Sequence, residues 1–395
     1  MTSTIQEFDI VIIGGGIVGA AAACRLSQQY SRIALVDKGA PISWQMNSPF
    51  GLRVSALNLA TIQLFQEIDI WQQITSMRVY PYKSMFVWEQ DGSAEIEFNA
   101  NETSHESLGA IVENQVILSA LIKLIEANNN ISRFDGAELI SCHSISDSTM
   151  LMELADNQKL SAQLLIGADG QRSKVRECIG IEIQQNIYHQ QGIVAVVKTE
   201  KSHQQTAWQC FNNEGPLALL PLSNNTCSIV WSVSAESCES LMDLSEAEFN
   251  NKITIGSETK LGQLNIISER KSFPLSGSQA DHYVDQRVAL MGDAAHVIHP
   301  LAGLGLNLGI ADVACFATLL AQSDRELGSH RVLRQYERER KSENIIMQHT
   351  LEWIDKLFRN EQQVTRSLRS LGVNMTNKAI PIKSLFMNKA LGIPA

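Results

Sequence analysis

The pattern of hydrophobic and polar residues over the first 37 positions predicts a strand, a helix and a second strand. Residues 8 to 13 (FDIVII) form a continuous apolar, β-branched run, which is typical of a strand buried on both faces of a parallel sheet. The small residues that follow Gly19 (AAAACRL) indicate a helix, and residues 32 to 36 (RIALV) indicate the next strand. These segments together predict a βαβ unit.

The pattern changes between residues 183 and 278. Apolar and polar positions alternate there in the stretches AVVKT, TAWQCF, LALLPL and CSIVWSV, which predicts antiparallel sheet with one face lining a cavity. Residues 287 to 291 (RVALM) indicate a return to a buried strand. Residues 331 to 358 then place charged and apolar positions at helical spacing.

This order of elements predicts an α/β (α+β) protein of more than one domain, since 395 residues exceed one ordinary core. We expect a Rossmann-like nucleotide-binding domain made of discontinuous pieces, an inserted antiparallel β-sheet substrate domain and a C-terminal helical segment. The expected boundaries are 1–75, 101–182 and 279–345 for the first, 76–100 and 183–278 for the second, and 346–395 for the third.

Composition and charge exclude several classes of protein. A net charge of −10 argues against a nucleic-acid binder, because neutralising phosphates needs a basic surface. The apolar run at residues 10 to 24 follows acidic residues and contains four glycines, so it is neither a signal peptide nor a membrane span, and we expect a cytoplasmic protein. Seven scattered cysteines indicate free thiols and no metal site: Cys24, Cys142, Cys178, Cys210, Cys227, Cys238 and Cys315.

The last thirty residues differ in charge from the rest of the chain. They hold five cations and no carboxylate, whereas the first 365 residues carry a net charge of −15. The cations are interleaved with leucines and isoleucines, which suits either contact with an anionic membrane or partner, or a helical segment packed on the body. We favour the packed segment and keep the surface contact as the alternative.

The first chemical motif is the turn Gly14-Gly15-Gly16-Ile17-Val18-Gly19, which follows a strand and opens a helix. Gly14 permits the tight turn, Gly16 lets the backbone approach a pyrophosphate, and Gly19 lets the helix pack on the strand. Asp37 ends the second strand, where a carboxylate can bind a ribose. Together these features predict a dinucleotide site, and Asp37 disfavours a nucleotide with a 2′-phosphate.

The second motif runs from Gly292-Asp293 to Asn307 and also follows a strand. An aspartate at a strand end can hold a polyol hydroxyl, and the glycines free backbone N–H groups to face an electron-rich ring. The plain alternative is a strand–turn–helix connection with Asp293 as helix cap. The third motif, Gly167 to Gly170 with Asp169, is by itself a common turn, and it gains meaning only beside the other two.

The three motifs, GGGIVG with Asp37, GADGQRSKVR and GDAAHVIHPLAGLGLNLG, occur in the order and spacing of a known family. In this respect the chain resembles the p-hydroxybenzoate-hydroxylase-type flavin monooxygenases, and within them the ubiquinone-biosynthesis hydroxylases of proteobacteria. The resemblance covers essentially the whole chain. It implies that the Rossmann-like domain binds FAD.

The resemblance also implies roles for individual residues. Gly14, Gly16 and Gly19 would hold the pyrophosphate and Asp37 the adenosine ribose. Further along the cofactor, the expected FAD contacts are Arg53, Asn114, Asp169, Gly292, Asp293, Gly303, Gly305, Leu306 and Asn307, with Asp293 on the ribityl chain and Gly303 to Asn307 facing the flavin ring. The segment around Asp169 would serve both FAD and the nicotinamide cofactor.

The chain departs from the family in the flavin-facing turn. Leu304 and Leu306 stand where the family usually has Gln and Val, which leaves backbone N–H groups intact and removes any role of the Gln side chain. No catalytic triad is expected, because the flavin carries the reaction. His299 and Pro300 are the expected neighbours of the flavin ring, and His296 and His299 suit either turn hydrogen bonds or acid–base work.

The implied reaction is hydroxylation of an aromatic ring. Only one dinucleotide fingerprint is present, so NAD(P)H would visit transiently, reduce the flavin and leave. O2 would then give a C4a-hydroperoxide that transfers oxygen to a polyprenylated phenol or quinol of ubiquinone biosynthesis. Stretches of the chain resemble both the 3-demethoxyubiquinol hydroxylases and the 2-polyprenylphenol C5 hydroxylases, so the ring carbon stays open.

Two other function classes remain as alternatives: a flavin-dependent reductase or halogenase of the same fold, and a non-catalytic flavin-holding subunit of a biosynthetic complex. The halogenase alternative lacks support because a GWxWxIP motif is absent. A contact with the inner membrane or with such a complex through the basic tail is the expectation for partners beyond substrate and O2.

Overall fold

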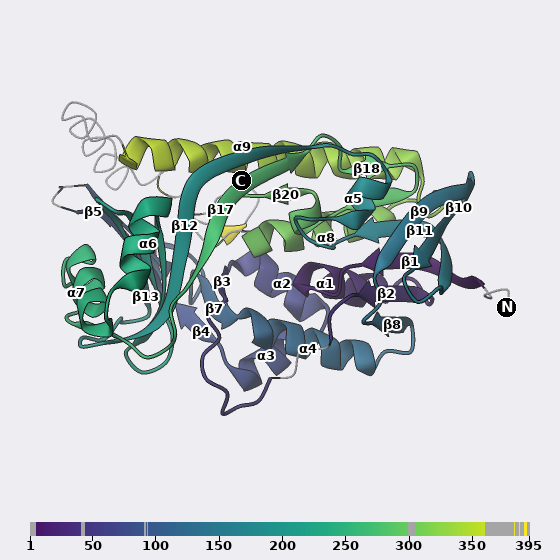
Figure 1. Ribbon diagram of the computed structural model, residues 1–395. Helices are drawn as coiled ribbons and strands as arrows, with labels where there is room; N and C mark the ends of the chain where they lie inside the picture. The colour runs from purple at the N-terminus through teal and green to yellow at the C-terminus, as the bar shows by residue number, and fades with distance from the viewer. Residues whose placement is uncertain are drawn as a thin grey trace.

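A computed structural model describes residues 5–40, 44–90, 92, 94–298, 303, 305–359, 383, 387, 391 and 392. Within these residues, two large sheets lie at opposite ends of the molecule, and one long helix runs beside both (Figure 1). The sheet at the N-terminal end carries the nucleotide motifs, and the other is antiparallel over most of its strands.

The first sheet has eight strands, and its core is parallel. The order is β18 (Val284–Asp285), β19 (Val288–Leu290), β11 (Lys159–Gly167), β1 (Ile5–Ile13), β2 (Ile33–Asp37) and β8 (Ile131–Asp135), while β9 (Leu139–Ser146) and β10 (Thr149–Leu154) extend β11. Ile10, Ile12 and Ile33 are fully buried, which confirms the predicted βαβ start of the chain.

Helices cover this sheet. They are α1 (Ile17–Leu26), α2 (Leu59–Glu67), α3 (Trp71–Met77), α4 (Asn114–Glu126), the short α5 (Lys174–Cys178) and α8 (Gly305–Ala321). Helix α1 contacts both α4 and α8, and its run of alanines is fully buried because small side chains allow close helix packing. A three-stranded sheet of β3 (Val54–Leu57), β7 (Gly109–Glu113) and β4 (Tyr80–Tyr82) lies between the two large sheets (Figure 1).

The second sheet has nine strands, and those between residues 183 and 278 are antiparallel to one another, as the alternation there predicted. The order is β20 (His296–Val297), β17 (Lys271–Ala280), β12 (Ile183–Thr199), β15 (Thr226–Ser234), β14 (Gly215–Pro221), β13 (Thr206–Asn212), β5 (Ser84–Glu89) and β6 (Glu95–Asn99), with β16 (Leu264–Ile266) on β12. One face packs on α6 (Ala235–Asp243) and α7 (Glu246–Gly256) through a core around Trp231 and Phe249. The short 3-10 turns η1 (Ala100–Glu102) and η2 (Gly292–Ala294) complete the regular structure.

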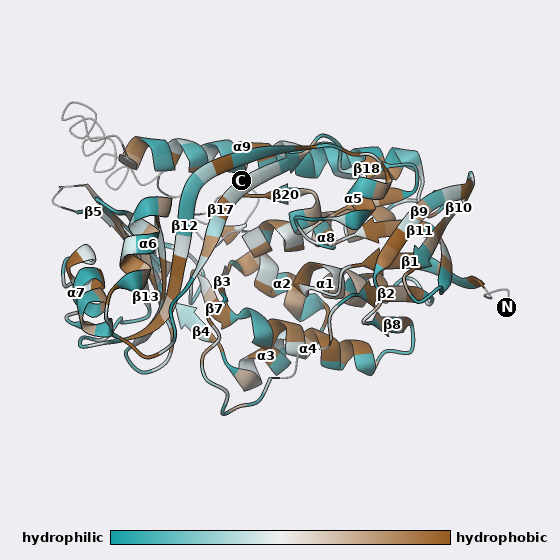
Figure 2. Ribbon diagram, in the orientation of Figure 1, coloured by the Kyte–Doolittle hydropathy of each residue, from teal (hydrophilic) through white to brown (hydrophobic). Residues whose placement is uncertain are grey.

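Helix α9 (His330–Arg359) connects the two halves. Its 30 residues correspond to about 45 Å. It packs on α8 and β18 at one end, and the ring of Phe358 stacks on Phe211 of β13 with centroids 3.9 Å apart at the other. Figure 2 shows a largely hydrophilic colour on this helix. The helix continues without a break across residue 345, where we predicted the C-terminal segment to begin.

The residues of the C-terminal segment that the structure describes are packed on the body. Met387 and Leu391 are buried in a cluster with Ala56 and Tyr82, and the Lys383 ammonium pairs with Glu102 at 2.8 Å. In the described part of the chain, no helix has the length and hydropathy needed to cross a membrane.

Candidate functional site

The three motifs meet because the strands that precede them are neighbours. In the parallel order β19, β11, β1, Ile13 pairs with Gly167 and Gly167 pairs with Leu290. The Ala168 N–H donates to Ile13 O at 2.8 Å, and the Met291 N–H donates to Gly167 O at 2.9 Å. Residues that are more than 270 positions apart therefore end at one edge of the sheet, which is where ligands bind in open α/β sheets.

Asp37 lies against the glycine turn. Its Oδ2 accepts the Gly15 N–H at 2.6 Å and its Oδ1 accepts the Gly39 N–H at 2.7 Å. These two bonds fix the half-buried carboxylate at the end of β2 and beside the start of α1. That position suits the predicted bond to a ribose hydroxyl, since each oxygen keeps a second lone pair.

Gly16 and Gly19 differ in their surroundings. A Cβ at Gly19 would lie 1.9 Å from Gly14 O, so the close packing of helix on strand requires glycine there. A Cβ at Gly16 would meet nothing within 4 Å, although Gly16 is the N-cap of α1 with ordinary φ and ψ. The helix N-terminus therefore faces open space, as an anion site at this position requires.

Asp169 combines a structural bond with an orphaned atom. Its Oδ2 accepts the Lys174 N–H at 2.6 Å and the Val175 N–H at 3.2 Å, which are the first two N–H groups of α5. Its Oδ1 is buried and has no hydrogen-bond partner among the described residues. A buried carboxylate oxygen without a partner is costly, and a ligand hydroxyl would satisfy it. Arg176 of α5 reaches across to Ala294 O at 2.8 Å and so joins this segment to the second motif.

Asp293 and Arg53 lie close enough for their charges to interact. The Asp293 side chain stays exposed within the 3-10 turn η2, and Met291, not Asp293, is the N-cap of that turn. Reduced hydration near the surrounding protein raises the pKa of the Asp293 carboxyl above its usual value, and interactions with His296 and Arg53 offset part of this rise. Arg53 is itself exposed, so the carboxylate and the guanidinium both remain available to a polyol and a phosphate.

One of the two polar groups of the Asn114 side chain is bonded within the protein. Its Oδ1 accepts the Ser55 hydroxyl at 2.7 Å, and its backbone N–H donates to Arg53 O at 3.0 Å. The preceding Glu113 is buried, accepts the Gly51 N–H at 2.7 Å and pairs with Arg78 at 3.3 Å. These contacts hold the strand and loop that carry Arg53, and the Asn114 side-chain NH2 has no partner among the described residues.

Asn307 makes three hydrogen bonds within the protein through its side-chain amide. Its Oδ1 accepts the Asn58 N–H at 3.0 Å and the Thr61 hydroxyl at 2.8 Å, and its Nδ2 donates to Ala56 O at 2.8 Å. The side chain is therefore largely committed to the protein, which leaves the backbone as the main group for the predicted flavin contact. A Cβ at Gly305 would meet nothing within 4 Å, so the start of α8 also faces open space.

The remaining flavin-facing predictions divide between described and undescribed residues. Leu306 packs against the core of the first sheet, and Gly303 has a positive φ of 60°. His299, Pro300 and Leu304 lie outside the described residues.

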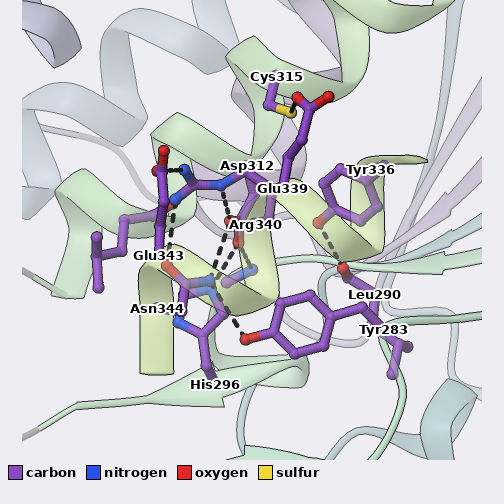
Figure 3. Close-up of polar contacts among 12 residues, drawn as sticks. Tyr283, Leu290, His296, Asp312, Cys315, Tyr336, Glu339, Arg340, Glu343 and Asn344 are labelled. Atoms are coloured by element: carbon purple, nitrogen blue, oxygen red, sulfur yellow. Dashed lines mark hydrogen bonds and ion pairs between the residues drawn. The ribbon is translucent and has the colours of Figure 1, made fainter. Parts of the chain in front are cut away.

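A buried polar network supports the second motif from behind (Figure 3). Asp312 of α8 is fully buried; its Oδ2 accepts His296 Nε2 at 2.6 Å and the Gly292 N–H at 3.0 Å, and its Oδ1 pairs with Arg340 Nε at 2.8 Å. Asn344 adds bonds to Asp312 and to the Tyr283 hydroxyl. Burial by itself raises the pKa of Asp312, but His296 and Arg340 outweigh it and lower the pKa to about 2.

The sequence did not predict this network. The His296 ring is buried and bonds to Asp312 of α8, which favours a hydrogen-bonding role over acid–base work. One signal for Asp312 was available, because it is the single charged residue in the 17 residues of α8. Arg340 had none, since it lies among many charged residues of α9 that face solvent.

The nine-stranded sheet lies beside the segment between Ile298 and Leu308, which we call the flavin turn. Its two faces differ in what they contact. Leu217, Leu219 and Trp231, with the partly buried Trp208, pack toward α6 and α7 as core, so this face of the sheet is not the one that could line a cavity. The opposite face carries Phe211, whose cluster includes Ile298 and Leu308 at the two ends of the flavin turn.

Comparison with known proteins assigns the chain to a family. The family model described as FAD binding domain matches residues 7–348. The chain is 33% identical over 394 residues to the 3-demethoxyubiquinol 3-hydroxylase of Escherichia coli, with 99% of this chain and 100% of that protein covered. It is 33% identical over 430 residues to the ubiquinone biosynthesis monooxygenase COQ6 of Xenopus tropicalis, with 96% and 92% covered.

Solved structures share the fold at low identity. The p-nitrophenol 4-monooxygenase PnpA of Pseudomonas putida has a TM-score of 0.78 at 16% sequence identity. The match covers 99% of this chain and 100% of that protein. HpxO of Klebsiella pneumoniae, complexed with FAD and uric acid, has a TM-score of 0.76 at 15% identity, with 98% and 97% covered.

Fold and site together define a flavoprotein of the p-hydroxybenzoate-hydroxylase type. The chain belongs to the family of FAD-dependent monooxygenases that includes the ubiquinone-biosynthesis hydroxylases. It is an FAD-dependent monooxygenase, and NAD(P)H is the reductant typical of this family. The residues present fit FAD, since the open helix start at Gly16, the orphaned Asp169 oxygen and the exposed Asp293 all lie at one sheet edge.

The two glycines of the first motif give a matched pair of variants. Gly16→Ala adds a Cβ that meets no protein atom, so we expect an unchanged melting temperature but an FAD affinity that falls about tenfold or more. Gly19→Ala adds a Cβ that clashes with Gly14 O, so stability itself should fall. Thermal unfolding of the apoprotein and fluorescence titration with FAD measure the two effects. Normal FAD binding by Gly16→Ala would show that the pyrophosphate lies elsewhere.

Asp312→Asn should destabilise the protein by at least about 3 kcal/mol. The substitution removes the carboxylate charge that pairs with the buried Arg340 and accepts a bond from the buried His296. The Asp312 pKa is lowered on folding from 3.8 to about 2, so its stabilisation is present above pH 4 to 5 and is lost as the pH falls toward 2. The stability gap between wild type and variant should therefore narrow over that range. Urea unfolding from pH 7 to pH 3 tests this, with the exposed Asp324→Asn as control; a gap independent of pH contradicts it.

Proposed function

We propose that this monooxygenase hydroxylates the aromatic ring of a polyprenylated phenol or quinol in ubiquinone biosynthesis. The observation that carries the proposal is the similarity over the full length to hydroxylases whose names state this pathway. An apolar sheet face beside the flavin turn supports it, because a prenylated ring needs a largely apolar wall on one side.

Each part of the site has a role in this proposal. The backbone at Gly14 to Gly19 and the carboxylate of Asp37 bind the adenosine half of FAD, while Asp293, Arg53 and Asn114 lie along its middle. Asp169 presents one free carboxylate oxygen to FAD or to the visiting NAD(P)H. When bound, FAD supplies the redox chemistry with NAD(P)H and O2, and the protein orients the ring and excludes water.

Contact with a membrane surface or a biosynthetic complex is a further part of the proposal. A polyprenylated substrate is membrane-soluble, so the enzyme has to meet it at the inner membrane or receive it from a partner. Of the five tail cations, Lys383 is described, and its ion pair with Glu102 commits it to the body. The other four, Arg366, Arg369, Lys378 and Lys389, remain the candidates for surface contact.

Turnover of the purified, FAD-loaded enzyme tests the reaction. With ortho-geranylphenol, NADPH and O2, we expect a hydroxylated product in near-equal amount to the NADPH oxidised, measured by mass spectrometry and absorbance. The Gly16→Ala variant is the control for flavin dependence. Oxidation of NADPH to hydrogen peroxide without product would favour the reductase alternative, and no oxidation by the FAD-loaded protein would favour a non-catalytic subunit.

Complementation identifies the ring carbon. We expect the chain to restore ubiquinone in an Escherichia coli strain that lacks the 3-demethoxyubiquinol 3-hydroxylase, or in a strain that lacks the C5 hydroxylase. The quinone intermediate that disappears from the lipid extract names the step. If neither strain recovers ubiquinone while the protein is produced and holds FAD, the proposed pathway is wrong.

A further inference from the structure

The face of the nine-stranded sheet that points toward the flavin turn contains an unusual row of side chains. Strand register aligns Val87, Gln209, Ala218, Val230 and Val194 in one line across β5, β13, β14, β15 and β12. Five adjacent strands make this row about 19 Å long. We call these five residues the cross-strand row.

Four of the five members of the cross-strand row are partly accessible, while Val194 at its end is buried. Val87, Gln209, Ala218 and Val230 are half-exposed, although β13, β14 and β15 are paired on both sides. The parallel row on one side includes the buried Phe211, and the row on the other side includes the buried Ala207, Ser228 and Val196. Partly accessible side chains therefore lie along the middle of this face, beside rows that contain buried residues together with the half-exposed Met85 and Leu220.

The two rows beside the cross-strand row lie near the flavin turn. Phe211 belongs to the cluster that contains Ile298 and Leu308 at the ends of that turn. Ala207 belongs to the cluster that contains Ala56, and a Cβ at Gly303 of the turn would lie 3.7 Å from the Ala56 Cβ. In strand β13, Gln209 lies between Ala207 and Phe211 and points to the same face.

Gln209 is the one polar member of the row, and its amide makes no hydrogen bond with the described residues. Its neighbours across the strands are Val87 and Ala218, which offer no polar atom. An apolar ligand that covered this row would strip water from the amide and leave it unpaired, which is unfavourable. A ligand with a hydroxyl at this point would avoid that cost.

From this arrangement we propose that Gln209 hydrogen-bonds the ring hydroxyl of the substrate and thereby orients the ring, while the aliphatic members of the cross-strand row contact its prenyl chain. The inference rests on the proposed function and adds the residue that selects a phenol or quinol over an unsubstituted ring. Gln209 is a specificity-determining residue in this scheme. A site built to bond a hydroxyl rejects an analogue that lacks it, because its own polar group is left bare.

Two probes that differ only in the hydroxyl test the inference by binding alone. Ortho-geranylphenol and geranylbenzene are titrated into the oxidised FAD-loaded enzyme, and binding is followed by the change in flavin absorbance. Wild type should bind the phenol about tenfold more tightly, as one hydrogen bond allows. Gln209→Met keeps the length of the side chain without its amide, and it should bind both probes with equal affinity.

Two further variants complete the design. Gln209→Glu keeps a hydrogen-bond acceptor and should retain a preference for the phenol, while Gln185→Leu, an exposed glutamine of β12 in the same sheet, should behave as wild type. FAD content and melting temperature report whether each variant folds. A tenfold preference that survives in folded Gln209→Met overturns the inference.

The outcome is separable from that of the proposed function. If wild type produces no hydroxylated product from ortho-geranylphenol, the proposed function fails whatever the Gln209 variants do. If wild type hydroxylates the phenol but binds it no better than geranylbenzene, the proposed function stands and the role of Gln209 falls.

Discussion

The flavin end of the molecule depends on the bonds that the buried carboxylate of Asp312 accepts. This carboxylate is fully buried, and it accepts a backbone N–H of the second motif, the ring of His296 and the guanidinium of Arg340. A buried charge is tolerated only when it is paired and hydrogen-bonded. The turn at Gly292, helix α8 and helix α9 must therefore be in place together. Because Phe358 of α9 stacks on Phe211, the same helix also ties the flavin turn to the second sheet.

The site works mainly through placed backbone and a few carboxylates. Asp37, Asp169 and Asp293 stand at or just after the ends of neighbouring parallel strands, and each has at least one oxygen or an exposed side chain left for a ligand. The ring of His296 bonds to the buried Asp312 carboxylate, which also accepts the Gly292 N–H, and so it supports the second motif from behind.

The nine-stranded sheet separates stability from recognition by its two faces. Trp208 and Trp231 belong to the core against α6 and α7, whereas the opposite face carries the partly accessible cross-strand row. Because side chains alternate along a strand, residues that are adjacent in sequence serve these different purposes. Trp208 and Gln209 are the clearest example.

The sequence by itself determined the nucleotide half of the protein. The apolar run before Gly14, the glycine spacing and Asp37 depend on local backbone geometry, so they predicted the βαβ unit, and the family resemblance extended this to FAD. The structure alone decided which distant groups meet. Nothing local marks Arg340 as buried among the charges of α9, and nothing local shows which face of β13 packs as core. Such pairings depend on strand register and helix packing, which bring together residues hundreds of positions apart.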